Sequence, residues 1–362
     1  MTAPKTTRPA LFSAAGFREL VSGRRRGVGA MLLRGGLRLA EFGYAAAMRV
    51  RNARYDAGRA ESHTVNAPVV CVGNLTLGGT GKTPLVEWIA RWFRERDVRV
   101  SIVSRGYGVE QGTRNDEALE LEQRLPDVPH LQHADRVEGA RTAIEEFESQ
   151  VVLLDDGFQH RRLARDLDIV LLDALEPFGF EHVFPRGLLR EPLSGLRRAG
   201  VVVLSRADLV DDPERRRIHD VVRKYNPTAP WCEVRHAPLR LLNSRGEEQP
   251  LDELRGKQVV GFCGLGNPEG FRRTLAGCGY DVAAFEEFPD HHNYQRADLD
   301  RLSTSAAAVG AEALVCTHKD LVKIQADRLQ GQPIWAIVVG LEFLSGEAAL
   351  IEKLTPLLPS EC

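Results

Sequence analysis

Short apolar runs alternate with longer amphipathic stretches along most of this chain. The run at residues 68–74 predicts a buried strand, and Leu85, Ile89, Trp92 and Phe93 then follow the spacing of one helix face within residues 82–96. Further strands are expected at residues 98–103, 151–154, 169–172 and 201–204, and later near 258–263, 312–316 and 334–339. Buried strands that alternate with helices are typical of a parallel sheet covered on both faces, so the expected fold class is α/β.

Residues 226–256 interrupt this alternation, because they have a mixed composition and contain Pro227, Pro230, Pro238 and Pro250. We expect a linker there, since 362 residues fit two domains of about 100–200 residues each. The expected units are a flexible leader (1–27), a basic amphipathic helix (28–60), an α/β domain (61–225), the linker (226–256) and a smaller C-terminal α/β domain (257–362).

Charge separates the N-terminal segment from the rest of the chain. The whole protein has a net charge of −2, which gives no nucleic-acid signature, but residues 1–60 hold twelve Lys or Arg against three Asp or Glu. Leu33, Leu37, Ala40, Tyr44 and Ala47 are spaced as one face of a helix among these arginines. Such a helix can lie in the interface of an anionic membrane, or it can pack on its own domain with a solvated arginine face. No run of 18 apolar residues predicts a transmembrane helix.

The six cysteines form no metal-binding or redox motif. Cys71, Cys232, Cys263, Cys278, Cys316 and Cys362 include no CxxC pair, and several lie in apolar runs. We expect buried, reduced thiols and no structural zinc site.

A glycine-rich motif, Gly78-Gly79-Thr80-Gly81-Lys82-Thr83, lies between the first predicted strand and the first predicted helix of this domain. Glycines let several backbone N–H groups point at one phosphate chain, the lysine adds a positive charge, and the Thr83 hydroxyl can reach Mg²⁺. The motif is a variant, because Thr76 stands where the usual pattern has its first glycine. The expected architecture is a P-loop NTPase-like parallel sheet domain, a second, smaller α/β domain and an N-terminal amphipathic helix.

A phosphate loop needs a carboxylate near its metal ion, and two strands end in one. Residues 151–154 lead into Asp155 and the polar cluster Asp156-Gly-Phe-Gln-His160, whereas residues 169–172 lead into Asp173. We favour Asp155, because active sites of open α/β sheets lie at the carboxyl ends of strands, and we expect Asp173 to cap its strand. Gly264-Leu-Gly266 is interpreted as a structural turn, since its third glycine comes one residue too late for a dinucleotide-binding motif.

Several motifs together resemble the tetraacyldisaccharide 4′-kinases (lipid A 4′-kinases). They occur in family order over roughly residues 30–340: Val72-Gly-Asn-Leu-Thr-Leu-Gly-Gly-Thr-Gly-Lys-Thr-Pro84, Ser104-Arg-Gly-Tyr-Gly108, Asp155-Asp-Gly-Phe-Gln-His160, Leu189-Arg-Glu-Pro192, Gly264-Leu-Gly-Asn-Pro268, Phe288-Pro-Asp-His-His-Asn-Tyr294 and Thr317-His-Lys-Asp-Leu-Val-Lys323. The resemblance implies Mg²⁺-dependent transfer of the ATP γ-phosphate to the 4′-hydroxyl of a membrane-embedded tetraacyldisaccharide 1-phosphate, which forms lipid IVA in lipid A biosynthesis. It also implies peripheral attachment to the cytoplasmic face of the inner membrane, and it favours membrane docking for the basic helix. No nucleic acid and no obligate protein partner are predicted.

The resemblance also suggests roles for individual residues. The ATP-binding residues would be Gly78, Gly79, Thr80, Gly81, Lys82, Thr83 and Arg136, and the metal-binding residues Thr83, Asp155 and Glu191. Substrate-binding residues would be Arg105, Tyr107, Asp156, Gln159, His160 and Arg190. Lys82, Asp116 and His291 would be catalytic, with Asp116 and His291 meeting across the cleft and either of them taking the proton of the sugar hydroxyl.

Two other classes of function compete with a lipid-sugar kinase. A P-loop ATPase or GTPase switch at a membrane surface would share the glycine-rich motif, but the chain has Leu77 where that class commonly has lysine, and it lacks a convincing guanine-reading NKxD element. A non-enzymatic membrane-binding module would leave the phosphate loop and the paired aspartates unexplained. Nucleotide turnover with and without an acceptor separates the three.

Overall fold

The computed structural model describes residues 14–78, 80–106, 121–122, 124–265, 268–289, 292–324 and 326–359. The helices are α1 (Ala14–Val21), α2 (Val28–Asp56), α3 (Lys82–Arg94), α5 (Arg136–Phe147), α6 (Asp212–Tyr225), α7 (Pro268–Gly277), α8 (Arg296–Ala308), α9 (His318–Ile324) and α10 (Glu347–Leu354). The strands are β1 (Val69–Asn74), β2 (Val100–Ser104), β3 (His130–Gln132), β4 (Val151–Asp155), β5 (Leu167–Asp173), β6 (Val201–Ser205), β7 (Trp231–Leu242), β8 (Glu248–Gln249), β9 (Gln258–Cys263), β10 (Asp281–Glu287), β11 (Ala313–Thr317), β12 (Arg328–Leu329) and β13 (Gln332–Ser345).

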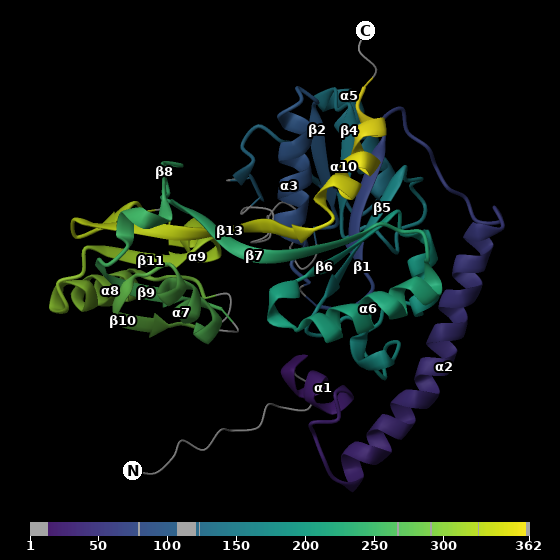
Figure 1. The fold of residues 1–362 in the computed structure, drawn as a ribbon, viewed down its shortest axis with the longest axis horizontal. Helices are drawn as coiled ribbons and strands as arrows, with labels where there is room; N and C mark the ends of the chain where they lie inside the picture. The colour runs from purple at the N-terminus through teal and green to yellow at the C-terminus, as the bar shows by residue number, and fades with distance from the viewer. Residues whose placement is uncertain are drawn as a thin grey trace.

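The strands within these residues form one 13-stranded sheet that runs through two lobes (Figure 1). Its main order is β10-β9-β11-β13-β7-β6-β5-β1-β4-β2-β3, and every neighbouring pair along it is parallel except β13 with β7. In the first lobe β1 lies between β4 and β5, with Val72 beside Asp155. The carboxyl ends of these parallel strands therefore meet at one edge, as the α/β expectation requires.

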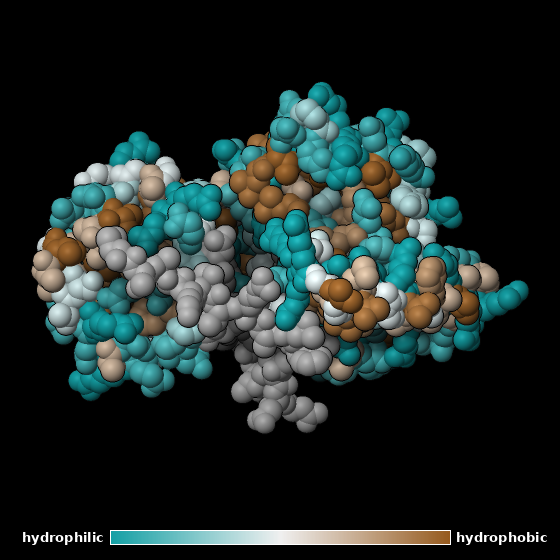
Figure 2. All heavy atoms as spheres, turned by 90° about the horizontal axis from the view of Figure 1, so that it is seen from below, coloured by the Kyte–Doolittle hydropathy of each residue, from teal (hydrophilic) through white to brown (hydrophobic). Residues whose placement is uncertain are grey.

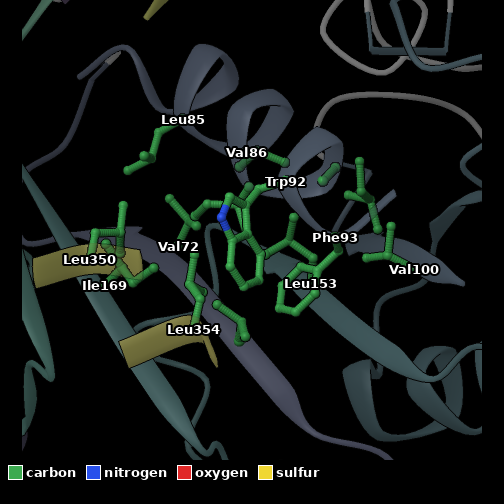
Figure 3. Close-up of a cluster of buried hydrophobic side chains, with 14 of the residues drawn as sticks. Val72, Leu85, Val86, Trp92, Phe93, Val100, Leu153, Ile169, Leu350 and Leu354 are labelled. Atoms are coloured by element: carbon green, nitrogen blue, oxygen red, sulfur yellow. The ribbon is translucent and has the colours of Figure 1, made fainter. Parts of the chain in front are cut away.

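One core of the first lobe lies between the sheet and the helices α3 and α10 (Figure 3), and a second buried cluster includes residues of α5 and α6. Leu85, Val86 and Phe93 of α3 are fully buried against strand residues such as Leu153. The C-terminal helix α10 returns to this lobe and buries Leu350 and Leu354 in the same cluster. Residues from both ends of the chain thus support the helix that begins at the phosphate loop.

Residues 226–256, where the prolines suggested a linker, run between the two lobes as regular structure (Figure 1). They contain β7, a 12-residue strand that pairs with β6 in the first lobe and with β13 over most of its length. Figure 1 shows β7 and β13 passing together from one lobe to the other. Pro238 fits into this ribbon because the β7–β13 register shifts beside its partner Val339, and such an irregularity tolerates a residue without an N–H donor.

Helix α2 packs along the first lobe, and of the predicted apolar face Leu37 and Tyr44 are half-buried. Glu41 and Ala45 are buried, whereas Leu33, Ala40 and Ala47 of the expected apolar face are exposed. Polar contacts set the rotation of the helix, because Glu41 accepts a hydrogen bond from the Val183 amide (2.9 Å) and Tyr44 donates one to the Arg190 carbonyl (3.0 Å).

The opposite side of α2 exposes apolar side chains three, four, seven or eight residues apart, the spacings of one helix face. Val28, Leu32, Leu39, Phe42 and Val50 are 58–75% exposed, and we call this set the outer stripe. Seen from below, brown side chains run along the right-hand part of the molecule where α2 lies (Figure 2). Within the described residues, no helix has the length and hydropathy needed to cross a membrane.

The expectation of buried thiols is confirmed for the part of the chain that the structure describes. Cys71, Cys232, Cys263, Cys278 and Cys316 are all free and buried. Burial raises the pKa of the Cys232 thiol to about 12, so this group stays protonated at neutral pH.

Candidate functional site

The phosphate loop leads from β1 into α3, and its backbone takes conformations that favour glycine. Gly78 has a φ of +112° and Gly81, the residue before α3, a φ of +78°. The loop rests on β6 and β7: the Ser205 hydroxyl donates to the Thr80 carbonyl (2.8 Å), and the His236 ring lies directly against Gly81. The Thr80 hydroxyl is buried with no hydrogen-bond partner among the described residues, which leaves it available to a bound group.

Three charged side chains converge beside this loop. The Lys82 ammonium lies 3.4 Å from an Asp156 carboxylate oxygen, and Arg190 donates to both Asp156 oxygens at 2.9 Å. Burial would raise the pKa of Asp156, but Lys82 and Arg190 outweigh it and hold that pKa below its ordinary value. Asp156 is therefore an anion that positions two cations at the mouth of the phosphate loop.

Arg190 reaches this position because its segment runs alongside the phosphate loop. The Leu77 amide donates to the Leu188 carbonyl and the Arg190 amide to the Leu75 carbonyl, both at 2.7 Å. These backbone contacts attach residues 188–190 to the strand-to-loop junction, so a residue far along the chain becomes part of the same site.

A cavity of about 750 Å³ opens at this edge of the sheet. Seven of its lining residues were predicted from the sequence, and the described structure places them together: Arg105, Arg136, Asp155, Asp156, Gln159, His160 and Arg190. The volume of this cavity and its position at the carboxyl ends of parallel strands are typical of a small-molecule binding site.

One wall of the cavity is strongly basic. Arg136 begins α5 and is 5% exposed, and burial, followed by the nearby Arg105, lowers its pKa. Burial and the adjacent Arg136 also lower the pKa of His160 to about 4, so this imidazole is neutral at physiological pH. The guanidinium groups of Arg136, at the start of α5, and of Arg105, directly after β2, provide a favourable environment for an anionic group.

Asp155 ends β4 and lines the cavity, whereas Asp173 does not. Asp173 forms an ion pair with Arg206 (2.7 Å) and accepts a hydrogen bond from the Leu175 amide (3.1 Å), which confirms the strand-capping interpretation. The described residues contain no cluster of three or more His, Cys, Asp or Glu side chains arranged for a metal ion. A carboxylate and a hydroxyl beside a phosphate loop nevertheless fit Mg²⁺, which takes few protein ligands and completes its shell with phosphate and water.

Glu191 does not fit the expected role of a metal ligand. Its side chain is 1% exposed, and its oxygens accept hydrogen bonds from Arg198 (2.8 and 3.0 Å), Asn52 (2.6 Å) and Gln159 (3.1 Å). The carboxylate is thus the buried partner of Arg198 and a link between α2 and the site. The side-chain amide of Gln159 is also engaged in structural contacts, because besides Glu191 it donates to the Asn74 carbonyl (3.0 Å).

Helix α2 supplies part of the cavity wall, which sequence reasoning had not included in the site. Tyr44, Met48 and Arg51 line the cavity, and Arg51 donates to the Gln159 carbonyl (2.6 Å). Their spacing of three and four residues was a signal of a shared helix face, but nothing in the sequence indicated what that face would contact.

Gly79, Tyr107, Asp116 and His291 lie outside the residues that the structure describes. Their assigned roles, including the pairing of Asp116 with His291, stay predictions. The neighbours of position 291 are described: the His292 ring stacks on Phe288 and donates from Nε2 to Asp298 (2.8 Å), and the Tyr294 hydroxyl donates to Asp320 (2.9 Å).

Comparison with known proteins adds an independent line of argument. The model of the tetraacyldisaccharide-1-P 4′-kinase family matches residues 33–358. A tetraacyldisaccharide 4′-kinase of Anaeromyxobacter dehalogenans (strain 2CP-C) is 42% identical over 337 residues, which cover 87% of this chain and 89% of that protein. Another, of Geobacter sulfurreducens, is 37% identical over 360 residues, or 93% and 99% of the two chains.

A solved structure is similar over nearly the same length. The crystal structure of LpxK from Aquifex aeolicus, described as an "apo" form in complex with ATP, aligns with a TM-score of 0.71 and 30% identity. The alignment covers 90% of this chain and 100% of that one.

Proposed function

Because the chain belongs to the tetraacyldisaccharide-1-phosphate 4′-kinase family, we propose that it transfers the γ-phosphate of ATP to the 4′-hydroxyl of tetraacyldisaccharide 1-phosphate, forming lipid IVA in lipid A biosynthesis. The observation that carries this proposal is the convergence of Lys82, Asp156 and Arg190 beside the phosphate loop, where Asp156 and Arg190 line a cavity with further basic residues. Phosphoryl transfer depends on positioning and on neutralising phosphate charge, which is what such a group of cations provides.

The site divides into an ATP side and an acceptor side. The phosphate loop and Lys82 would hold the β- and γ-phosphates, with Thr83 and Asp155 as the residues that hold Mg²⁺, and Arg136 nearby. Bound Mg²⁺ would neutralise charge on the phosphates. Arg105, Arg190 and His160 face the remaining cavity, where guanidinium groups suit a sugar 1-phosphate and a neutral imidazole suits hydrogen bonds to a sugar.

Deprotonation of the attacking hydroxyl is assigned to Asp116 and His291 acting together. A carboxylate that holds an imidazole can raise its basicity, and an imidazole can equally orient a carboxylate. Asp116→Ala and His291→Ala should each reduce kcat strongly with little change in ATP binding. The double variant should be little worse than the weaker single variant, because members of one catalytic unit are non-additive. Fully multiplicative losses would contradict the pairing.

The activity itself is tested with purified protein, labelled ATP and tetraacyldisaccharide 1-phosphate in detergent micelles. The expected product is a bisphosphorylated lipid that requires the acceptor and forms far more slowly with Lys82→Ala. A protein that hydrolyses ATP at the same rate without acceptor would instead be a P-loop switch, the alternative that the family membership disfavours.

We also propose that α2 attaches the enzyme to the cytoplasmic face of the inner membrane as a peripheral protein. The outer stripe offers apolar side chains to the bilayer. Beside it, Arg51, Arg54, Arg59 and Arg162 line a groove of about 680 Å³ that also contains Val50 of the stripe. Apolar residues flanked by arginines suit the interface of an anionic membrane, where the acylated substrate is embedded.

Point substitutions test this attachment better than deletion of residues 1–60, which would also remove Tyr44 and Met48 from the cavity wall. Leu39→Ser with Phe42→Ser should lower binding to all vesicles by at least about tenfold, since each buried side chain contributes roughly 1.5–3 kcal/mol. Arg54→Gln with Arg59→Gln should weaken binding only to vesicles that contain phosphatidylglycerol, by roughly fivefold per arginine at low salt. Leu209→Ser, at an exposed leucine outside α2, is the control and should bind like the wild type. Unchanged flotation of both α2 variants would contradict the docking proposal.

A further inference from the structure

A buried group of charges joins the phosphate-loop helix to the second lobe. Arg124 is 5% exposed, although it follows a stretch of polar sequence. Its guanidinium donates to Glu87 of α3 (2.7 Å), to the Val339 carbonyl of β13 (2.8 Å) and to Nδ1 of His318, the first residue of α9 (3.0 Å). One side chain therefore contacts the first lobe, the ribbon between the lobes and the second lobe.

The first-lobe end of this group is held firmly. Glu87 lies five residues after Lys82 on α3, and it also accepts a hydrogen bond from Arg91 (3.0 Å) and lies 3.9 Å from Arg240 of β7. Arg91 in turn donates to the Arg124 carbonyl (2.8 Å). The guanidinium of Arg124 thus has little freedom to move relative to the phosphate-loop helix.

The second-lobe end is equally constrained. Two residues after His318, the buried Asp320 accepts hydrogen bonds from the Gly264 amide (3.0 Å), the Tyr294 hydroxyl (2.9 Å) and the Thr317 hydroxyl (2.6 Å). In the first turn of α9, His318 therefore contacts Arg124. Asp320, in the same turn, holds the loop that follows β9 and the loop that precedes α8. Burial, followed by Asp320, raises the pKa of Tyr294, so its hydroxyl remains a donor.

A buried ionic network is poor evidence for added stability, because desolvation of the charges offsets much of their attraction. Its geometry has another consequence. The bond to His318 is directional, and Arg124 also contacts Val339 of β13, the strand that passes between the lobes (Figure 1), so it restrains the rotation of one lobe on the other.

We propose that Arg124 is a positioning residue for the kinase reaction, which acts through His318 to set the second lobe on the phosphate-loop helix. The inference rests on the proposed function and adds a residue to which no role in it had been assigned. His318 belongs to the motif at residues 317–323. The proposal therefore gives this motif a role in positioning the second lobe that is separate from ATP binding.

Three variants test the proposal in the full-length protein. His318→Leu removes the acceptor for Arg124, whereas His318→Asn keeps an oxygen near the position of Nδ1. Asp127→Asn is the matched control, because Asp127 forms an exposed ion pair between the same segment and Arg94 of the same helix without contact to the second lobe. Each is characterised by its ATP Kd, by kcat and KM for ATP and for the lipid acceptor in micelles, and by the midpoint of urea unfolding.

His318→Leu should lower kcat by roughly 10- to 100-fold, the range that a misplacement of about 1 Å causes, and should change the ATP Kd less than about twofold. His318→Asn should recover most of kcat, and Asp127→Asn should match the wild type. If His318→Leu does not fold, Arg124→Lys replaces it in the test. Lysine retains a positive charge for Glu87 but cannot contact Glu87, Val339 and His318 together. The expected result is again a lower kcat with little change in the ATP Kd.

The proposal is overturned if the folded His318→Leu protein keeps the wild-type kcat, if it loses ATP affinity as much as kcat, or if His318→Asn is no better than His318→Leu. Failure of the proposed function gives a different result, since the wild-type enzyme would then show no acceptor-dependent transfer.

Discussion

Gly81 allows the phosphate-loop geometry to be tested by a single added methyl group. Its φ of +78° costs an L-residue about 1–2 kcal/mol. An added Cβ would also lie 2.2 Å from Cε1 and 2.6 Å from Nε2 of His236, far inside the separation of about 3.5–4.0 Å that carbon atoms prefer. Because the ring is packed between the loop and β7, we expect a further cost of about 1–3 kcal/mol for overpacking. Gly81→Ala should therefore lower the free energy of unfolding by about 2–5 kcal/mol in total.

The two contributions can be separated by removing the ring. In the double variant Gly81→Ala/His236→Ala the clash disappears while the backbone strain remains, so the two substitutions should couple favourably by about 1–3 kcal/mol. Gly78→Ala is the control, because its φ is +112° but no described atom lies within 4 Å of the added Cβ. Its cost should combine additively with that of His236→Ala.

Equilibrium urea unfolding of the single and double variants measures these free energies, and calorimetric titration with ATP measures the effect on the loop. ATP should bind more weakly to Gly81→Ala, since a displaced loop can no longer direct its amides at one phosphate. Additive costs at positions 81 and 236 would refute the close approach of the ring, and unchanged stability of Gly81→Ala would refute the loop geometry itself.

Three further predictions concern the site. Lys82→Ala should lower kcat by about 10²–10³ in the acceptor-dependent assay, the usual cost of losing one charge-stabilising group, and near-normal turnover would contradict its role. Asp155→Asn should lose far more activity than Asp173→Asn in the same assay; the reverse order would mean that the metal carboxylate is on β5. The folded-state pKa of His236, about 4, lies below the ordinary 6.5, so the folded chain binds fewer protons between these values and stability should fall as the pH drops from about 6.5 to 4. His236→Asn should reduce that dependence in urea unfolding and leave the part that comes from His160, whose pKa is also about 4.

Local patterns in the sequence were sufficient for the elements that carry the phosphate loop. The continuous apolar run of β1, the glycines after it and the 3.6-residue periodicity of α3 are properties of neighbouring residues, and each has a direct backbone cause. The same holds for the strand that ends at Asp155. Strands with mixed faces were harder to recognise: β10 has a largely alternating, half-exposed pattern, and β7 combines a proline with charged residues.

The sequence alone determined the α/β class, the phosphate loop and the order of the motifs, because these depend on contacts within a few residues. Only the tertiary structure decided which distant charges became partners. Arg190 lies 34 residues from Asp156, and Arg124 lies 194 residues from His318, yet each pair is in hydrogen-bond contact. The rotation of α2 and the contact of His236 in β7 with Gly81 were likewise decided only by the tertiary structure. Such pairings follow from the strand order of the sheet and from the need to pair every buried charge, and neither leaves a periodic signal in the chain.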